Sequence, residues 1–152
     1  MEHVTDITRI IQLAVAPVFL LTAIGTILSA LNNRLGRIVD RRRVVQERVR
    51  RGDTGDAQGL KEDTYELELL GQRIGLIYHS IVMAIVCALF ICLLVASAFV
   101  GVFVAFDIAR LIGTLFILAM FALIVCLWLL LREVFLAVKV GRHDILVKDI
   151  LR

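Results

Sequence analysis

Small and polar residues recur along the first apolar run of the chain, at positions where an all-apolar surface would be expected. They are Thr22, Gly25, Thr26, Ser29 and Asn33, and the same spacing continues through Gly36 and Asp40. Residues spaced by three or four share one face of a helix. This polar stripe supports two interpretations: a helix-packing surface, since small residues let helices approach closely, or a polar path for an ion or small solute. The pattern favours packing, and an oligomer would satisfy both.

A second group of residues is charged and lies just beyond the ends of the apolar runs. Its members are Arg34, Arg37, Asp40, Arg41, Arg132 and Glu133. Three interpretations are open. Arg34 or Arg37 could pair with Glu133 in a network that locks helices together, which is the favoured one. The arginines could form a basic ring that selects anions in an oligomer, or simply contact anionic lipid headgroups.

Residue types that carry catalysis are scattered or missing. His3, His79 and His143 lie in different segments, and all three cysteines fall inside apolar runs. Neither spacing suits a metal site. Every Asp and Glu lies at or beyond the ends of the apolar runs, and the glycine-rich stretch 52–59 lacks the Lys of a P-loop. The sequence therefore predicts a non-enzymatic protein without catalytic, metal or cofactor sites.

The elements that must position these residues are three apolar runs, at about residues 10–31, 81–106 and 108–131. A helix needs about 20 apolar residues to cross a bilayer, and each run is that long. Of the 152 residues, 60% are hydrophobic, and the mean hydropathy is +0.90. The sequence predicts an all-α integral membrane protein with three transmembrane helices. A tight turn is expected near Phe106–Asp107, with Asp107 capping the third helix.

The polar segment 32–80 has the spacing of two further helical arms. One heptad series comprises Leu31, Leu35, Ile38, Arg42, Val45 and Val49; a weaker one comprises Leu60, Thr64, Leu67, Gly71, Ile74, Tyr78 and Ile81. Turn-forming residues fill 52–59 between them. We expect an antiparallel helical hairpin that extends the first two spans. In the tail, 132–152, the third helix is expected to run to about Gly141, with a short amphipathic helix from Asp144.

The distribution of basic residues predicts an orientation. Of the 17 Lys and Arg, ten lie in 32–80 and five in 132–152. Positive residues stay on the cytoplasmic side, so the hairpin and C-terminus are expected inside and the N-terminus outside. The net charge of +3 thereby indicates anionic headgroups as the partner, and nothing in the sequence indicates nucleic-acid binding.

The stretches Ala16–Gly25 and Asn33–Arg41 resemble the opening signature of a bacterial membrane family catalogued as domain of unknown function 2721. Weaker similarities are Glu68–Ile74 and Leu131–Val134. The resemblance implies a multi-spanning protein of the bacterial inner membrane, and it carries no catalytic residue. With the stripe, it leads to two functional hypotheses. One is a homo-oligomer that conducts an ion or solute along the stripe, and the other is a scaffold or sensor subunit that binds a cytosolic or membrane protein through the hairpin.

Overall fold

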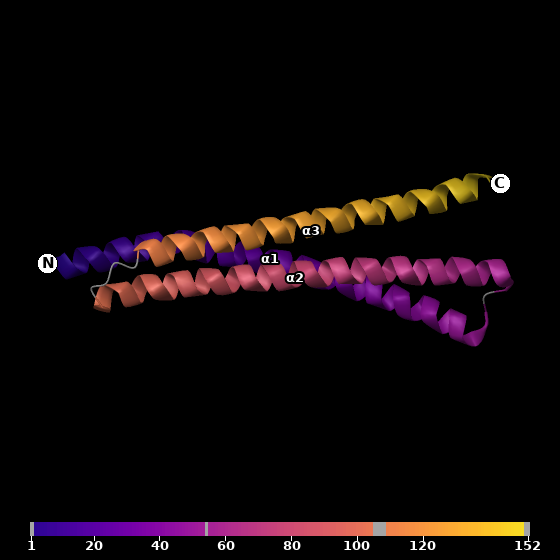
Figure 1. Ribbon diagram of the computed structural model, residues 1–152, viewed down its shortest axis with the longest axis horizontal. Helices are drawn as coiled ribbons and strands as arrows, with labels where there is room; N and C mark the ends of the chain where they lie inside the picture. The colour runs from indigo at the N-terminus through magenta and orange to yellow at the C-terminus, as the bar shows by residue number, and fades with distance from the viewer. Residues whose placement is uncertain (1, 54, 105–108, 151–152) are drawn as a thin grey trace. The chain divides into compact units, whose positions relative to one another are not determined.

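Three long helices make up the part of the chain that the computed structural model describes, and no strand occurs in it. They are α1 (Glu2–Arg51), α2 (Ala57–Val104) and α3 (Ala109–Ile150) (Figure 1). The structure describes residues 2–53, 55–104 and 109–150, and the side chains of 15–53, 55–101 and 109–138. Each helix contains a segment long and apolar enough to cross a membrane. The predicted all-α class, with three helices long and apolar enough to span a membrane, is confirmed.

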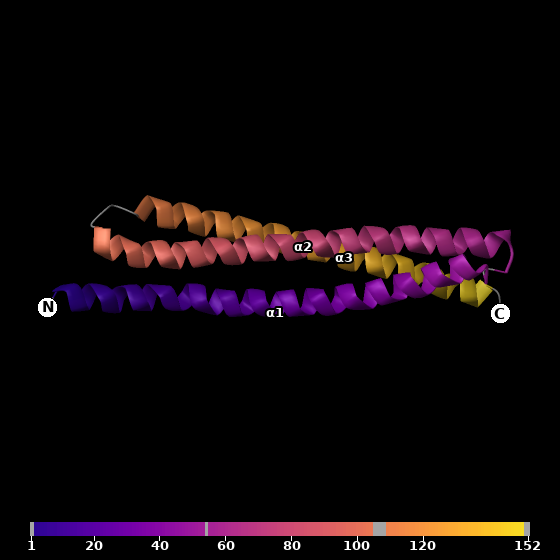
Figure 2. The same ribbon diagram turned by 90° about the horizontal axis from the view of Figure 1, so that it is seen from below.

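The turn between α1 and α2 ends the first helix with backbone hydrogen bonds of the Schellman type. The Gly52 amide donates to the Val49 carbonyl, and the Asp53 amide to the Arg48 carbonyl, both at 3.2 Å. Gly52 has a φ of 73°, a left-handed conformation that glycine adopts at little cost. Asp56 then caps α2, because its Oδ1 accepts from the Gly59 amide at 3.0 Å. Figure 2 shows the ribbons of the three helices from a second direction.

Two expectations about helix ends have different outcomes. The turn near Phe106–Asp107, and the Asp107 cap with it, lie outside the described residues. The predicted break at Gly141 is wrong, because α3 continues without interruption to Ile150. One glycine costs a helix interior only about 1 kcal/mol relative to alanine, which is too little to end a long helix.

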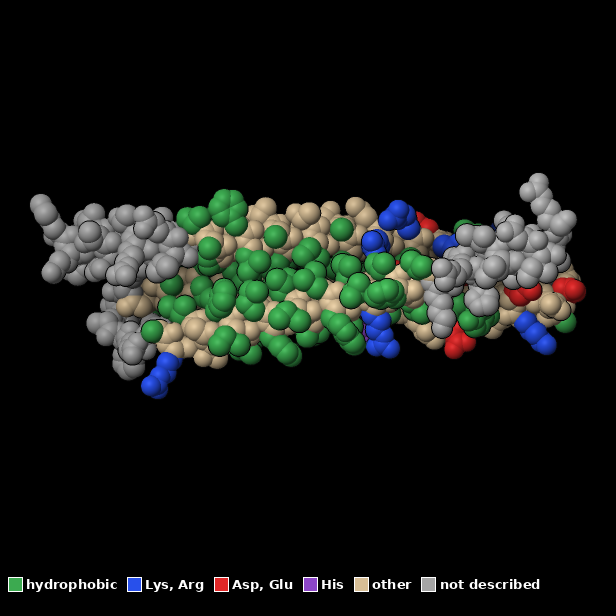
Figure 3. Space-filling view, turned by 90° about the horizontal axis from the view of Figure 1, so that it is seen from above, with side chains coloured by type: hydrophobic (Ala, Val, Ile, Leu, Met, Phe, Trp, Pro, Cys, Tyr) green, Lys and Arg blue, Asp and Glu red, His purple; other side chains and the backbone are tan. Residues whose placement is uncertain are grey.

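One compact unit comprises Met1–Ala30 and Ile81–Cys126. Its buried side chains include both large and small ones, namely those of Ile24, Ala84, Cys87, Ile91, Leu94, Ala119, Ala122 and Cys126. Many other large apolar side chains face outward, with Phe19 72% and Ile117 68% exposed. Figure 3 shows apolar side chains gathered into a continuous area on the face drawn. Such a surface suits lipid rather than water, so the chain is a multi-pass membrane protein.

The other unit comprises Leu31–Ser80 and Leu127–Arg152. Its core combines apolar and polar side chains: Leu31, Ile38, Val45, Leu70 and Ile77 are buried together with Asp63, Ser80 and Glu133. The heptad series predicted for α1 is confirmed at Leu31, Ile38 and Val45, which are seven residues apart and buried.

The heptad series predicted for α2 is wrong. Tyr78 and Leu60 are exposed, whereas Asp63, Leu70 and Ile77 are buried at intervals of seven. With the half-buried Glu66 and Arg73 and the buried Ser80, these positions form a series along α2 with alternating spacings of three and four residues. The core-facing stripe of α2 therefore contains charged residues, which is why an apolar pattern selected the wrong face.

Candidate functional site

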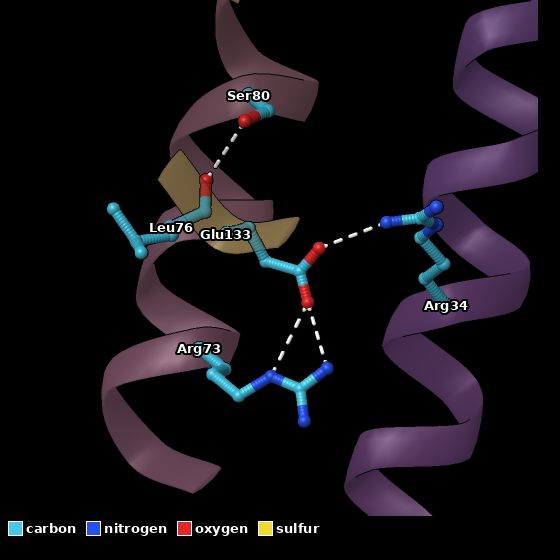
Figure 4. Close-up of polar contacts among 5 residues, drawn as sticks. All are labelled: Arg34, Arg73, Leu76, Ser80 and Glu133. Carbon is cyan, nitrogen blue, oxygen red and sulfur yellow. Dashed lines mark hydrogen bonds and ion pairs between the residues drawn. The ribbon is translucent and has the colours of Figure 1, made fainter. Parts of the chain in front are cut away.

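A buried carboxylate held by two arginines forms the polar centre of the second unit. Glu133 on α3 is only 2% exposed, and it accepts from Arg34 on α1 and Arg73 on α2 (Figure 4). Arg34 Nη1 lies 2.9 Å from Oε2. Arg73 donates to Oε1 twice, from Nε at 3.2 Å and from Nη2 at 2.8 Å. Each helix thus contributes one member of this Arg34–Glu133–Arg73 triad.

The heptad spacing of each helix explains why these side chains meet. Glu133 follows the buried Cys126 by seven residues, so it continues the core-facing stripe of α3. Arg73 lies between the buried Leu70 and Ile77, at three and four residues from them. Arg34 occupies the equivalent place between Leu31 and Ile38. Residues at these intervals face the same side of a helix, so all three side chains point into the bundle.

The triad satisfies the buried carboxylate but not the charge of its partners. Burying an ionised group is costly unless charged partners and hydrogen bonds compensate, and Glu133 receives three N–H donors. No buried side-chain nitrogen or oxygen in the described part of the chain lacks a hydrogen-bond partner. Two guanidiniums nevertheless share one carboxylate, so the triad keeps one net positive charge.

Two further ion pairs join α1 to α2 at seven-residue intervals from Arg34. Arg41 binds Glu66 in a bidentate manner, with Nε–Oε1 at 2.7 Å and Nη2–Oε2 at 3.1 Å. Arg48 Nη1 lies 3.5 Å from Asp63 Oδ1. We call Arg34, Arg41 and Arg48 the arginine ladder. Its acidic partners stand on the polar core-facing positions of α2 and α3, so charge complementarity follows the heptad.

A basic groove opens beside the triad. It has a volume of about 310 Å³ and is lined by Arg34, Arg37, Ile38, Arg41, Leu70, Arg73 and Glu133. Four guanidiniums and one carboxylate therefore surround this space, and Ile38 and Leu70 form its apolar part. Ile38 and Leu70 are both core residues, so this part of the groove is held by packing.

The structure brings together only part of the predicted charged group. Arg34 and Glu133 form an ion pair, and Arg41 pairs with Glu66 instead. Arg37 lines the groove, while Asp40 is exposed. Neither Arg37 nor Asp40 forms an ion pair with another side chain that the structure describes.

Arg132 and Arg73 also differ from the predicted group. The Arg132 guanidinium lies 5.8 Å from the centre of the Trp128 ring, in a cation–π contact. Arg73, absent from the predicted group, takes the place beside Glu133. The three-and-four spacing through Leu70, Arg73 and Ile77 is the signal in the sequence that could have identified it.

The polar stripe of α1 lies on an exposed side of the helix. Thr22, Gly25, Thr26, Ser29 and Asn33 are all exposed. A Cβ atom added at Gly25 would meet nothing within 4 Å. The hydroxyls of Thr22 and Thr26 donate to the carbonyls four residues earlier, Val18 and Thr22, at 3.3 and 3.1 Å. The stripe therefore does not pack against the described part of the same chain.

No group of three or more His, Cys, Asp or Glu side chains that could hold a metal occurs within the residues described. Comparison with known proteins yields a family and nothing closer. The model of a family described as "Protein of unknown function (DUF2721)" matches residues 14–143. No curated protein matches the chain, and no solved structure does.

Proposed function

This chain belongs to the DUF2721 family, whose model covers most of its length, and from this starting point we propose a non-enzymatic, homo-oligomeric membrane assembly. Copies of the chain pack through the polar stripe of α1 and enclose a path for an ion or small solute. The assembly resides in the bacterial inner membrane. The extension 32–80 is a cytoplasmic antiparallel hairpin, the C-terminus is inside, and the N-terminus is outside.

The outward position of the stripe is the observation that carries this proposal. At 3.6 residues per turn, Thr22, Gly25, Thr26 and Ser29 lie about 100–160° around the helix from the buried Ile24. A polar, small-residue face gains little from contact with lipid, whereas it permits close helix packing and hydrogen bonding between subunits. Three helices alone cannot readily enclose a path among themselves, so a path requires several copies.

The contacts of the arginine ladder support the antiparallel hairpin. Arg41 on α1 pairs with Glu66 on α2, and Arg48 pairs with Asp63. The partner number falls as the α1 number rises, as expected for two arms that run in opposite directions. The excess of arginine in this segment supports its cytoplasmic location.

Purified protein in liposomes tests the conducting hypothesis. Ion flux through the wild type should be strongly reduced in Thr26→Leu and Asn33→Leu, because leucine replaces the polar surface along the path. Ala23→Leu is the matched control, since Ala23 is exposed on the same helix outside the stripe, and its flux should equal that of the wild type. Equal flux in all four proteins would show that the stripe serves only in helix packing. An absence of flux through the wild type would contradict the conducting hypothesis.

Oligomerisation is tested separately in detergent or nanodiscs. Gly25→Leu should lower the number of subunits, because its side chain has open space in the protomer yet blocks close approach by a neighbouring helix. The fold of the protomer should be unchanged. A wild type that is monomeric in both media would contradict the assembly itself.

A scaffold or sensor subunit is the second candidate, and exposed apolar residues on the hairpin favour it. Val44, Leu60 and Tyr65 are 55%, 45% and 65% exposed, although they lie outside the apolar runs. Such residues suit a protein partner. This hypothesis predicts no flux, together with a partner that co-purifies with wild type and is lost in Val44→Ser/Tyr65→Ser. Retention of that partner by the double variant would place its binding elsewhere.

A further inference from the structure

The basic groove of the second unit holds more positive charge than its own carboxylates neutralise. Arg34 and Arg73 share Glu133, and Arg41 is bound by Glu66. Arg37 lines the same groove and forms no ion pair with a described side chain. Four guanidiniums and one carboxylate line this space of about 310 Å³, and Glu66 binds Arg41 from outside the lining, so positive charge is in excess around it.

The donors that remain are suited to a phosphate group. A guanidinium has five N–H donors in a fixed planar arrangement. Arg34 uses Nη1 for Glu133, and Arg73 uses Nε and Nη2. Both retain N–H groups, and Glu133 positions both guanidiniums before any ligand arrives, that of Arg73 through two hydrogen bonds and that of Arg34 through one. Such preorganisation reduces the entropy that binding would otherwise cost. Arginine binds phosphate in a bidentate manner as it binds carboxylate.

The groove residues also lie close to the ends of the apolar runs. Arg34 follows Leu31 by three residues, Glu133 follows Leu131 by two, and Arg73 precedes Ile81 by eight. Lipid phosphates are found at this depth in a bilayer, and basic pockets between helices there bind anionic headgroups. Ile38 and Leu70 give the groove an apolar part that could contact a glycerol or acyl segment.

We propose that this groove is a binding site for the phosphate group of an anionic ligand. Arg37 binds the phosphate directly, and Arg34 and Arg73, oriented by Glu133, complete the site. The ligand is a phospholipid headgroup or a free phosphate ester, since both present the same anion. This site is independent of oligomerisation and conduction, because all of its residues belong to one chain.

Native mass spectrometry of the detergent-solubilised protein tests the lipid source. Phosphatidylglycerol should bind more tightly than phosphatidylcholine, and Arg37→Gln should weaken phosphatidylglycerol binding about tenfold, the loss expected for one charge-assisted hydrogen bond. Arg43→Gln is the matched control, because Arg43 is exposed on the same helix and lies outside the groove. The affinity of this variant for phosphatidylglycerol should stay within about twofold of that of the wild type.

Thermal unfolding in sodium phosphate, compared with sodium chloride at equal ionic strength, tests the free phosphate source. Phosphate should raise the midpoint for wild type and Arg43→Gln but not for Arg37→Gln, since a ligand stabilises the state that binds it. A response in either arm supports the site and identifies the source. Absence of selectivity in both arms, or equal losses for Arg37→Gln and Arg43→Gln, would overturn the proposal.

Discussion

Glu133 on α3 joins all three helices through ion pairs with Arg34 on α1 and Arg73 on α2. Its carboxylate is nearly inaccessible and stands between guanidiniums from α1 and α2. Two cations held near each other by one anion are stable only while that anion is present. The triad therefore works as a structural lock, and its strength depends more on the carboxylate than on either arginine.

Removing the charge of Glu133 should destabilise the protein strongly. We expect Glu133→Gln to lower the free energy of unfolding by about 3 kcal/mol, since it leaves two arginines without their counter-charge. Reversible unfolding in mixed micelles would measure the change. Asp40→Asn is the control, because Asp40 is exposed and forms no ion pair with a described side chain; its effect should stay within about 0.5 kcal/mol. Equal effects for the two variants would contradict the lock.

The two arginines should contribute unequally. The Arg73 side chain is 21% exposed and makes two hydrogen bonds to Glu133, whereas that of Arg34 is 41% exposed and makes one. Arg73→Met should therefore cost about 1 kcal/mol more than Arg34→Met, which corresponds to one additional hydrogen bond. The same unfolding measurement decides this, and a larger loss for Arg34→Met would reverse the assignment.

At the scale of the helices, the sequence predicted the heptad period of α1 and α2 correctly, but it predicted the buried face correctly only for α1. Leu31, Ile38 and Val45 identify the buried face of α1 because those positions are apolar. On α2 the same face includes Asp63 and Arg73, and a search for apolar residues passes over them. Their burial depends on partners from other helices, and no local pattern identifies these partners.

The face of α2 can be tested with neighbouring residues. Ile77 is fully buried and Tyr78 is 60% exposed. Ile77→Ala should destabilise the protein by about 3 kcal/mol, since it removes buried methylene groups and leaves a cavity. Tyr78→Ala should cost less than about 1 kcal/mol in the same assay. If Tyr78→Ala were the more damaging, the face first predicted from the sequence would be the buried one.

The end of α1 should respond to acid. Glu47 is bound by Arg50 and Arg51 at 2.8–2.9 Å, and these guanidiniums, Arg50 foremost, lower the pKa of Glu47 below its usual 4.5. A lowered carboxylate pKa contributes stability at neutral pH, and that contribution is lost as the pH falls through the folded-state value. The protection of the amides near Arg48–Arg51, which compares their exchange rate with the intrinsic rate at the same pH, should therefore decrease below about pH 4.5. In Glu47→Gln this step should be absent.

At the scale of the whole molecule, solvation distinguishes the two units, and composition alone made this predictable. In the first unit many large apolar side chains are exposed, which is the arrangement expected when lipid is the solvent. In the second unit, ion pairs and buried charges occur among the apolar core residues. The predicted residues Arg34 and Glu133 meet there because three apolar runs of similar length bring their ends together. Which arginine completes the triad depends on helix register, which run lengths do not determine.

The orientation proposed for the membrane gives the last prediction. In a variant whose three native cysteines are replaced by alanine, Asp53→Cys places an exposed thiol between α1 and α2. A membrane-impermeant thiol reagent should leave it unlabelled in intact cells and label it after permeabilisation. Arg110→Cys, at the start of α3 and exposed, is the opposite control and should be labelled in intact cells. The segment between the first two apolar runs holds ten Lys and Arg, whereas the segment that starts the third run holds only Arg110. Ten basic residues oppose translocation more strongly than one does. The reverse labelling pattern would place the arginine ladder outside the cell and invert the topology.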